Sequence, residues 1–330
     1  MTNAIPETMR VVTMREAGGP DVLEISIEDT PAPSAGEVLI KVTAAGVNGP
    51  DLVQRRGHYP PPKGASPHLG LEVSGEVVAL GEGVTQWALG DRIVALTNGG
   101  GYADYVAVDA GHCLPVPSGV DEIDAAGLCE TYFTVWSNVF YGQAIPKGGT
   151  FLVHGGSGGI GTTAVQLGTA MGLKVLTTIP DEDAAKFVTD LGAARAINFR
   201  DEDFVEITRE EGGADIILDI IGGDYIARNI KAASPDARII QLAFNAGSKV
   251  EINLMPIMLK RLSYTGSTLR SRPEDFKTAI ARDLAEKVWP LFADGRLKPV
   301  THKVLPLDQA SEAHQLMESA THHGKILLTP

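Results

Sequence analysis

The chain has 330 residues, enough for two domains, with 44% apolar and 21% charged residues as in ordinary globular proteins. Its 28 basic and 41 acidic residues give a net charge of −13, which argues against nucleic acid or an anionic membrane as the main partner. It contains no apolar run long enough to cross a bilayer, no secretory leader, and only two cysteines, Cys113 and Cys129, with no metal or redox spacing. We therefore expect a cytoplasmic protein.

Short strand-like runs characterise the first part of the chain. Residues 38–43, 74–80 and 91–96 are rich in Val, Ile and Leu, and turns rich in glycine, proline and acidic residues separate them. This pattern predicts a compact β-rich domain. The chain ends on another such run, residues 324–328, after a polar helical segment at 272–293.

A glycine-crowded turn follows the apolar strand at residues 150–154. Gly156, Gly158 and Gly161 have the spacing G-x-G-x-x-G, and a helix begins near Gly159. Such glycines give a tight turn, close approach to a pyrophosphate and close helix packing, and the helix N-terminus favours an anion. The alternative is an ordinary strand-to-helix turn without a ligand. We predict a dinucleotide site formed by Gly156, Ser157, Gly158, Gly159, Ile160 and Gly161.

Strands and helices alternate after this turn. The strand at 174–179, a helix at 183–191 and further strands at 196–198, 214–220 and 238–242 lack polar alternation, as is typical of parallel strands covered on both faces. We expect an α/β fold with a doubly wound parallel sheet at residues 128–268. The β-rich domain then consists of residues 1–127 and 269–330.

Five segments, in this order, resemble the zeta-crystallin-like quinone oxidoreductases of the medium-chain dehydrogenase/reductase superfamily: 45–62, 69–75, 154–161, 266–272 and 324–328. The similarity covers nearly the whole chain. It implies a GroES-like β-barrel catalytic domain that holds a Rossmann domain, with the active site in the cleft between them. It also implies a homodimer paired through an edge strand of the nucleotide-binding sheet, for which the apolar segment 250–254 looks suited.

The resemblance also bears on zinc. Zinc alcohol dehydrogenases of the superfamily have a cysteine where this chain has Asn48 and a histidine where it has Leu71. Neither residue can replace those ligands. We therefore expect no metal, and reduction of quinones or conjugated enones by hydride transfer, because these electrophiles need no Lewis acid.

The resemblance implies roles for several further residues. Asn48 would donate a hydrogen bond to the developing oxyanion, or only tie its turn. Asp51 and Tyr59 would line the substrate cleft, although Tyr59 could simply anchor a loop. Thr134 would lie near the nicotinamide, or be a spacer within its helix. Arg270 and Lys325 are candidates for cofactor contacts, with a surface ion pair as the alternative for Arg270.

The cofactor is expected to be NADPH, with NADH as the alternative. Relatives that use NADPH hold its 2′-phosphate with a lysine and a tyrosine, at positions where this chain has Ala184 and Phe199. Asp181 stands where an acid binds a ribose 2′-hydroxyl, which favours NADH. Arg200, beside Phe199, could instead meet a phosphate.

Two other functions remain open at this point. A reductase of enoyl thioesters could use the same scaffold, although no basic groove for a coenzyme A phosphate is evident in the sequence. The second open function is that of a structural or regulatory protein that binds a nucleotide with little turnover. It stays open because the sequence contains no clear pair of acid and base residues for catalysis.

Overall fold

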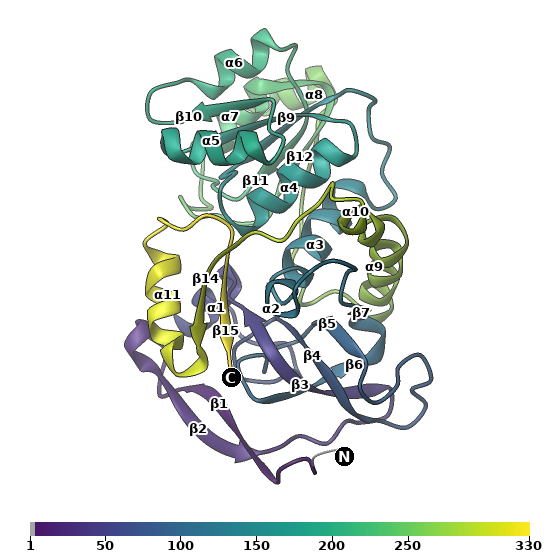
Figure 1. Ribbon diagram of the computed structural model, residues 1–330. Coiled ribbons are helices and arrows are strands. Elements are labelled where there is room, and N and C mark those ends of the chain that lie inside the picture. Colours follow the sequence, from purple (N-terminus) through teal and green to yellow (C-terminus); the bar gives the residue numbers. More distant parts are fainter. Residues whose placement is uncertain (1–3) are drawn as a thin grey trace. The chain divides into compact units, whose positions relative to one another are not determined.

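The chain folds as two units in the computed structural model, which describes residues 4–330 (Figure 1). Unit 1 comprises Met1–Phe133 and Arg270–Pro330, and unit 2 comprises Thr134–Leu269. The first boundary lies inside helix α3 (Cys129–Val135), whereas the sequence pattern places it at residue 127. No glycine or proline marks a position inside a helix, so the sequence offers no signal there.

Unit 2 is built on a six-stranded parallel sheet of order β10-β9-β8-β11-β12-β13. Counted from β8, this is the order 3-2-1-4-5-6 of the Rossmann fold. The strands are β8 (Thr150–His154), β9 (Lys174–Ile179), β10 (Arg195–Asn198), β11 (Ala214–Asp219), β12 (Ala233–Gln241) and β13 (Ser263–Gly266). The doubly wound α/β class predicted from the sequence is therefore confirmed.

Helices connect these strands, because a parallel neighbour can be reached only by a crossover. They are α4 (Gly159–Ala170), α5 (Glu182–Asp190), α6 (Phe204–Glu210), α7 (Tyr225–Ala232) and α8 (Met255–Lys260). The central strands β8 and β11 are buried along nearly their whole length. Their unbroken apolar runs thus reflect covering of both faces of the sheet.

The edge of this sheet differs from the sequence prediction. Residues 250–254 form no strand, and the edge strand is β13, which pairs with β12 from Ser263 to Gly266. All four residues of β13 are exposed. A short, polar, exposed strand has no hydrophobic pattern, which explains why the sequence does not reveal it.

Unit 1 contains a seven-stranded sheet of order β14-β15-β3-β4-β5-β7, in which β6 also pairs with β3, and a two-stranded sheet of β1 and β2. All pairs are antiparallel except β14 with β15. The strands are β1 (Thr8–Met14), β2 (Leu23–Asp29), β3 (Glu37–Gly46), β4 (Glu72–Leu80), β5 (Arg92–Leu96), β6 (Tyr105–Asp109), β7 (Cys113–Pro115), β14 (Thr301–Pro306) and β15 (Lys325–Thr329).

Both chain segments of unit 1 contain helices. They are α1 (Gly49–Arg55), α2 (Glu122–Ala125), α3, α9 (Glu274–Lys287), α10 (Trp289–Ala293) and α11 (Ala310–Glu318). The predicted helix at 272–293 is thus two helices that meet at Val288. Pro290 explains the break, since it lacks an N–H and fits only the first turn of a helix.

Strand β3 is the centre of unit 1, because it pairs with β4, β6 and β15. Its residues Val38, Ile40 and Val42 belong to one buried hydrophobic cluster, which also receives Ile326 and Leu328 from the end of the chain. The last strand therefore completes the core begun by the first hundred residues. Among the described residues, no helix combines the length and the apolar composition needed to cross a bilayer.

Candidate active site and cofactor site

The protein's own packing requires glycine at two of the three motif positions after β8. A Cβ at Gly156 would lie 2.0 Å from Thr177 Oγ1, and one at Gly161 would lie 2.1 Å from the carbonyl oxygen of Gly155. A Cβ at Gly158 would meet no atom nearer than 3.8 Å, and its φ of −79° suits any residue. The missing side chain at Gly158 therefore leaves open space beside the turn.

The turn also offers hydrogen-bond donors. Gly158 is the N-cap of α4, and the first N–H groups of a helix have no partner within it. Ser157, Gly159 and Ile160 are only partly buried. Open space, backbone donors and the positive end of a helix dipole together fit a pyrophosphate. These residues would hold the diphosphate of a nicotinamide dinucleotide.

The carboxyl ends of β9 and β10 form a pocket with more acidic than basic lining. Asp181, Glu182, Asp201 and Glu202 line it, and its one arginine, Arg195, is already paired with Glu202. The Asp181 carboxylate caps α5 by accepting the N–H of Ala184 at 2.9 Å. Asp181 is exposed, so it remains available to a ribose hydroxyl at this edge.

Phe199 and Arg200 lie at the same edge. The N–H of Phe199 donates to the carbonyl oxygen of Ile179 at 3.1 Å, which joins the end of β10 to the end of β9. Phe199 is 44% exposed, and the Arg200 guanidinium carbon lies 6.0 Å from the centroid of its ring. The Arg200 side chain has no carboxylate partner within residues 4–330, so its charge is free for a phosphate.

Thr134 stands on α3 and belongs to unit 2, together with the glycine turn. It is partly buried, and its carbonyl oxygen accepts a hydrogen bond from Asn138 Nδ2 at 2.8 Å. Its hydroxyl makes no hydrogen bond in the described part of the chain. Asn48, Asp51 and Tyr59 belong to unit 1.

A group of polar side chains lies near the start of α1, and we call it the polar cluster: the buried Asn48, Asp51, Glu72 and Lys325, and the partly buried Glu130. Its centre is an ammonium group. Lys325 Nζ is 2.7 Å from Glu72 Oε1, 2.5 Å from Asn48 Oδ1 and 3.0 Å from the carbonyl oxygen of Val47. Lys325 is 7% exposed and Glu72 0%. Such a buried charge needs a counter-ion and hydrogen bonds, and both are present.

Strand register explains this arrangement. Strand β15 runs antiparallel to β3, with Leu327 opposite Gly46, so Lys325 lies beside the residues that follow β3. The N–H of Val47 continues the ladder by donating to Ile326 at 2.9 Å. Glycine at position 46 lets Glu72 approach, because a Cβ there would lie 2.1 Å from Glu72 Oε1.

The Asn48 amide is fully used inside the protein. Its Nδ2 donates to Glu72 Oε1 at 2.8 Å and to the carbonyl oxygen of Gly46 at 3.2 Å, while Oδ1 accepts from Lys325. A carboxamide has two N–H donors, and both are occupied. Asn48 would therefore have to release one partner before it could donate to a substrate oxyanion. In this arrangement it orients Lys325 and Glu72.

Asp51 is buried under three hydrogen-bond donors. Its carboxylate accepts from the N–H of Asn48 at 2.9 Å, the N–H of Gly70 at 2.9 Å and the Tyr102 hydroxyl at 3.1 Å. Burial raises the pKa of Asp51 to about 6, against the lowering effect of these hydrogen bonds and of Lys325. The bond from Asn48 also starts α1, since an acid at the third helical position commonly caps the preceding N–H.

The hydrogen bonds of Asp51 continue through the core as a directed chain. The Tyr102 oxygen is 3.3 Å from His314 Nε2, and His314 Nδ1 is 3.0 Å from Arg55 Nη1. Arginine only donates, so His314 must accept on Nδ1 and carry its proton on Nε2. Burial, and after it the positive charge of Arg55, lowers the pKa of His314 to about 3, which keeps the imidazole neutral. Arg55 finally pairs with Glu318 near the surface.

Arg270 is 7% exposed, and its guanidinium is held by neutral oxygens of unit 1. Nη1 donates to Gln54 Oε1 at 2.5 Å, and Nη2 donates to the carbonyl oxygen of Asn98 at 2.7 Å. Its guanidinium carbon lies 5.9 Å from the centroid of the Tyr59 ring. Arg270 thus supports the loop that carries Tyr59, and binding a phosphate would require it to exchange these partners.

Zinc does not fit the positions where zinc alcohol dehydrogenases bind it. Leu71 is a buried hydrocarbon side chain, and the Asn48 oxygen is occupied by an ammonium ion. Thiolate and imidazole, the ligands that zinc prefers, are both missing there. Lys325 instead supplies the positive charge at this place.

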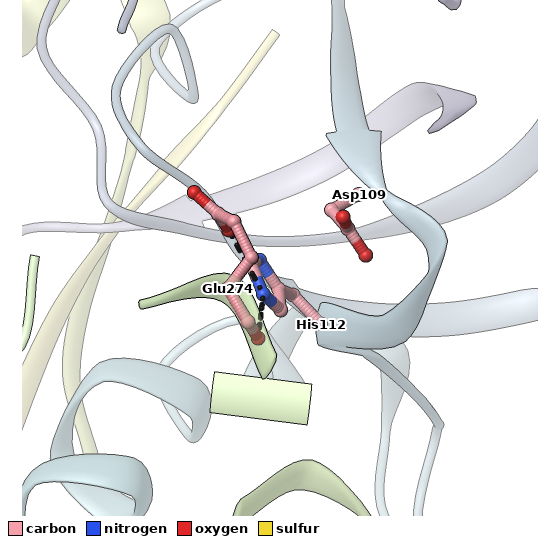
Figure 2. A group of neighbouring side chains, drawn as sticks. All are labelled: Asp109, His112 and Glu274. Carbon is pink, nitrogen blue, oxygen red and sulfur yellow. Dashed lines mark hydrogen bonds and ion pairs between the residues drawn. The ribbon is translucent and has the colours of Figure 1, made fainter. Parts of the chain in front are cut away.

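Within residues 4–330, one other group could offer three metal ligands: Asp109, His112 and Glu274 (Figure 2). Its atoms already have partners. His112 Nε2 is 3.1 Å from the carbonyl oxygen of Glu274, and the Asp109 carboxylate accepts the N–H of Gly111 at 2.7 Å. Lys277 Nζ lies 3.3 Å from Glu274 Oε2, and its charge would repel a metal ion. We interpret this group as a network of hydrogen bonds and one ion pair, Lys277–Glu274, that joins α9 to the sheet.

Comparison with known proteins agrees with this architecture. Residues 34–118 match the alcohol dehydrogenase GroES-like domain, and residues 191–328 match the zinc-binding dehydrogenase family. A quinone oxidoreductase of Rattus norvegicus is 32% identical over 330 residues, which cover 97% of each chain. The chain belongs to the zeta-crystallin-like quinone oxidoreductases of the medium-chain dehydrogenase/reductase superfamily. The resemblance seen in the sequence is therefore confirmed, and the protein is an oxidoreductase of the NAD(P)H-dependent type.

Other solved structures share the fold. The mycobacterial protein Rv1454c, crystallised as a complex with NADPH, is 27% identical and superposes with a TM-score of 0.86 over 98% of this chain and all of that one. The CurK enoyl reductase is 25% identical, with a TM-score of 0.85 over 98% of this chain and 99% of that one.

Several residues of this quinone oxidoreductase-type site were not predicted. Glu130, Tyr102 and His314 complete the surroundings of Asp51 and Glu72, yet no short motif contains them. Glu130 offered one signal, because it is a single charged residue within the apolar segment 125–136. The contact between Tyr102 and His314 joins residues 212 positions apart, which sequence patterns do not report.

Proposed function

We propose that the protein reduces quinones or conjugated enones by hydride transfer from NADPH, without zinc. The observation that carries this proposal is the buried Lys325 ammonium, which bonds to Asn48 and Glu72 where a metal would otherwise sit. Oxidation of a simple alcohol needs a Lewis acid or an equivalent base, whereas quinones and enones accept hydride directly. The family relationship to curated quinone oxidoreductases supports the same substrate class.

NADPH is proposed as the cofactor because the related mycobacterial structure holds it. In addition, Arg200, two residues after β10, pairs with no carboxylate among residues 4–330. The bound nicotinamide supplies the hydride. This chain's part is to hold the pyrophosphate at the Gly158 turn of unit 2 and to offer the partly buried Tyr59 of unit 1 to the substrate. Asp51 was expected to line the cleft, but it is only 1% exposed and does not reach the surface. The acidic lining around Asp181 supports NADH as the alternative.

Two sets of assays test this proposal. Purified protein is titrated with NADPH and NADH, and cofactor absorbance is then followed with a panel of quinones and enones of increasing electron affinity. We expect the rate to rise with electron affinity. Treatment with a chelator should leave the rate unchanged, because this site contains neither a thiolate nor an imidazole to bind zinc. Oxidation of simple alcohols, or loss of activity on removal of stoichiometric zinc, would contradict the proposal.

Reduction of enoyl thioesters is a second candidate, favoured by the similarity to the CurK enoyl reductase. The chemistry is the same hydride addition to an electron-poor double bond. The two functions differ in the recognised group, so the same assay with a short enoyl thioester distinguishes them. A higher kcat/KM for the thioester than for every quinone and simple enone would establish this second function.

We also propose a homodimer. Strand β13 is an exposed sheet edge, and the neighbouring α8 carries the exposed apolar side chains Met255, Met258 and Leu259. An unpaired edge beside apolar side chains invites pairing with a second copy. Light scattering at micromolar concentration should give twice the chain mass of 34.9 kDa. A monomer mass would contradict this. The cytoplasmic location stays a prediction.

A further inference from the structure

Three carboxyl groups of the polar cluster share one ammonium ion. Glu72 pairs with Lys325, and Asp51 accepts three hydrogen bonds. Glu130 differs from both. Its backbone N–H donates to Glu72 Oε2 at 2.8 Å, which fixes its place beside the cluster. Its own carboxyl makes no hydrogen bond or ion pair within residues 4–330.

Neighbouring carboxyl groups of low exposure favour keeping a proton on one of them, because like charges at close range are costly. Glu130 is the one with no donor to stabilise its charge. Burial raises its pKa to about 8, with the Glu72 charge second and Asp51 adding to it, while Lys325 and Arg270 lower it. These are the charged groups that face Glu130 from the surrounding elements. Its carboxyl therefore holds a proton at neutral pH.

Glu130 is also less buried than the other carboxyl groups of the cluster. Asp51 and Glu72 are almost completely buried, at 1% and 0% exposure, whereas Glu130 is only partly buried. Burial, and after it the charge of Glu130, raises the pKa of the Tyr59 hydroxyl, which places Tyr59 within electrostatic range of Glu130. Thr134 follows Glu130 by four residues on α3, and residues i and i+4 share one face of a helix. Glu130 thus lies near both residues expected at the substrate and the nicotinamide.

We infer that Glu130 is the proton donor of the reaction, an inference that rests on the proposed function. When an enone accepts hydride at its β-carbon, the electron pair of its double bond moves to the carbonyl and forms an enolate. The α-carbon of the enolate takes the proton from the Glu130 carboxyl, so that a C–H bond forms while the O–H bond of Glu130 breaks and leaves a carboxylate. Solvent returns a proton to this carboxylate. Overall, the acceptor, NADPH and one proton are converted to the reduced acceptor and NADP⁺.

Glu130→Gln tests this role, because it keeps the size of the side chain and removes the proton. Glu122→Gln on α2 is the matched control in the same unit. Rates are measured across pH with two acceptors, a simple enone and a strongly electron-poor quinone whose reduced anion is stable without a proton. We expect Glu130→Gln to lower the enone rate by roughly 100-fold or more. The quinone rate should stay near that of the wild type.

The pH profile separates a proton donor from a merely structural residue. The wild-type enone rate should fall as pH rises through about 8, where Glu130 loses its proton. This fall in rate should be absent in Glu130→Gln. Glu130→Asp keeps a carboxyl, so it should restore part of the rate and the fall of the rate at high pH. Glu130→Ala repeats the loss of the proton if the glutamine variant does not fold. An unchanged enone rate and pH profile in Glu130→Gln or Glu130→Ala would overturn the inference. A wild-type protein that reduces neither acceptor would overturn the proposed function, and this inference with it.

Discussion

The glycine turn of unit 2 and the polar cluster of unit 1 are both candidate sites, but they are assembled in opposite ways. The turn occupies residues 155–161, and its features are backbone space and backbone N–H groups. The polar cluster joins side chains from four distant segments, and its features are burial and charge. A backbone site depends on local residue types, whereas a side-chain site depends on strand register and packing. The predictions below test this difference.

The largest expected effect on cofactor binding is at the turn. Gly158→Val should weaken binding of the dinucleotide by at least roughly 100-fold, about 2.7 kcal/mol, because the side chain fills the open space beside α4. Folding should be retained, since a Cβ there meets no atom nearer than 3.8 Å. Cofactor titration and thermal unfolding measure the two properties. Unchanged affinity would remove the turn from the cofactor site.

Gly161→Val is the matched comparison within the same turn. Its Cβ would lie 2.1 Å from the Gly155 carbonyl oxygen, so this variant should lose folded protein as well as binding.

The second prediction concerns the ammonium of the polar cluster. Lys325→Met should lower the free energy of unfolding by about 3–5 kcal/mol, because the buried Glu72 carboxylate then lacks its counter-ion. Denaturant unfolding measures the loss. The double variant Lys325→Met/Glu72→Gln should recover part of it, since the uncompensated charge is gone. Equal stability of Lys325→Met and wild type would show that the pair is not buried as described.

A smaller effect is expected in the hydrogen-bond chain. Tyr102→Phe should cost about 1–3 kcal/mol, because it leaves His314 Nε2 without its acceptor and removes a donor from Asp51. Tyr264→Phe is the control: its hydroxyl also makes one hydrogen bond, to Gln241, but it stands on the exposed edge strand β13. Equal losses in the two variants, by denaturant unfolding, would argue against a special role of the buried chain.

The last prediction concerns the dependence of stability on pH. Glu130 ionises near its ordinary pKa of 4.5 in the unfolded chain and near 8 in the folded protein. Between these values the folded state binds the proton and the unfolded state does not, so the free energy of unfolding falls as pH rises. The pKa of Asp51 is also raised, from 3.8 to about 6, so Asp51 lowers the free energy of unfolding in the same way as pH rises between these two values.

Glu130→Gln should remove the Glu130 part of this decline. The variant should therefore gain thermal stability relative to wild type on going from about pH 5 to about pH 9. Parallel Tm profiles of the two proteins would show that the pKa of Glu130 is not raised in the folded state.

Much of unit 2 was predictable because its signals are local. The strand at 174–179 was predicted with the bounds that β9 has, and the helix predicted at 183–191 differs from α5 by one residue at each end. Unbroken apolar runs and glycine turns suffice for such elements. The edge strand β13 was missed because it is short, polar and exposed.

The candidate site of unit 1 was predictable only in part. Asn48, Asp51 and Tyr59 lie in one contiguous motif, so family resemblance identified them together. Lys325 was predicted as a cofactor contact, and only the pairing of β15 with β3 shows its ammonium bonded to Asn48. Arg270 was also expected at the cofactor or the surface, and its buried contacts to neutral oxygens have no local signal.

The sequence by itself determined the Rossmann class, the glycine turn and the family, because each depends on residue types within a short stretch of chain. The tertiary structure decided which charged groups share the buried space around Glu72, and hence which carboxyl keeps a proton. The physical reason is that the pKa of a carboxyl group and its hydrogen-bond partners depend on burial and on the distances between side chains. Those distances are set by strand register between segments far apart in the chain, and no local pattern contains them.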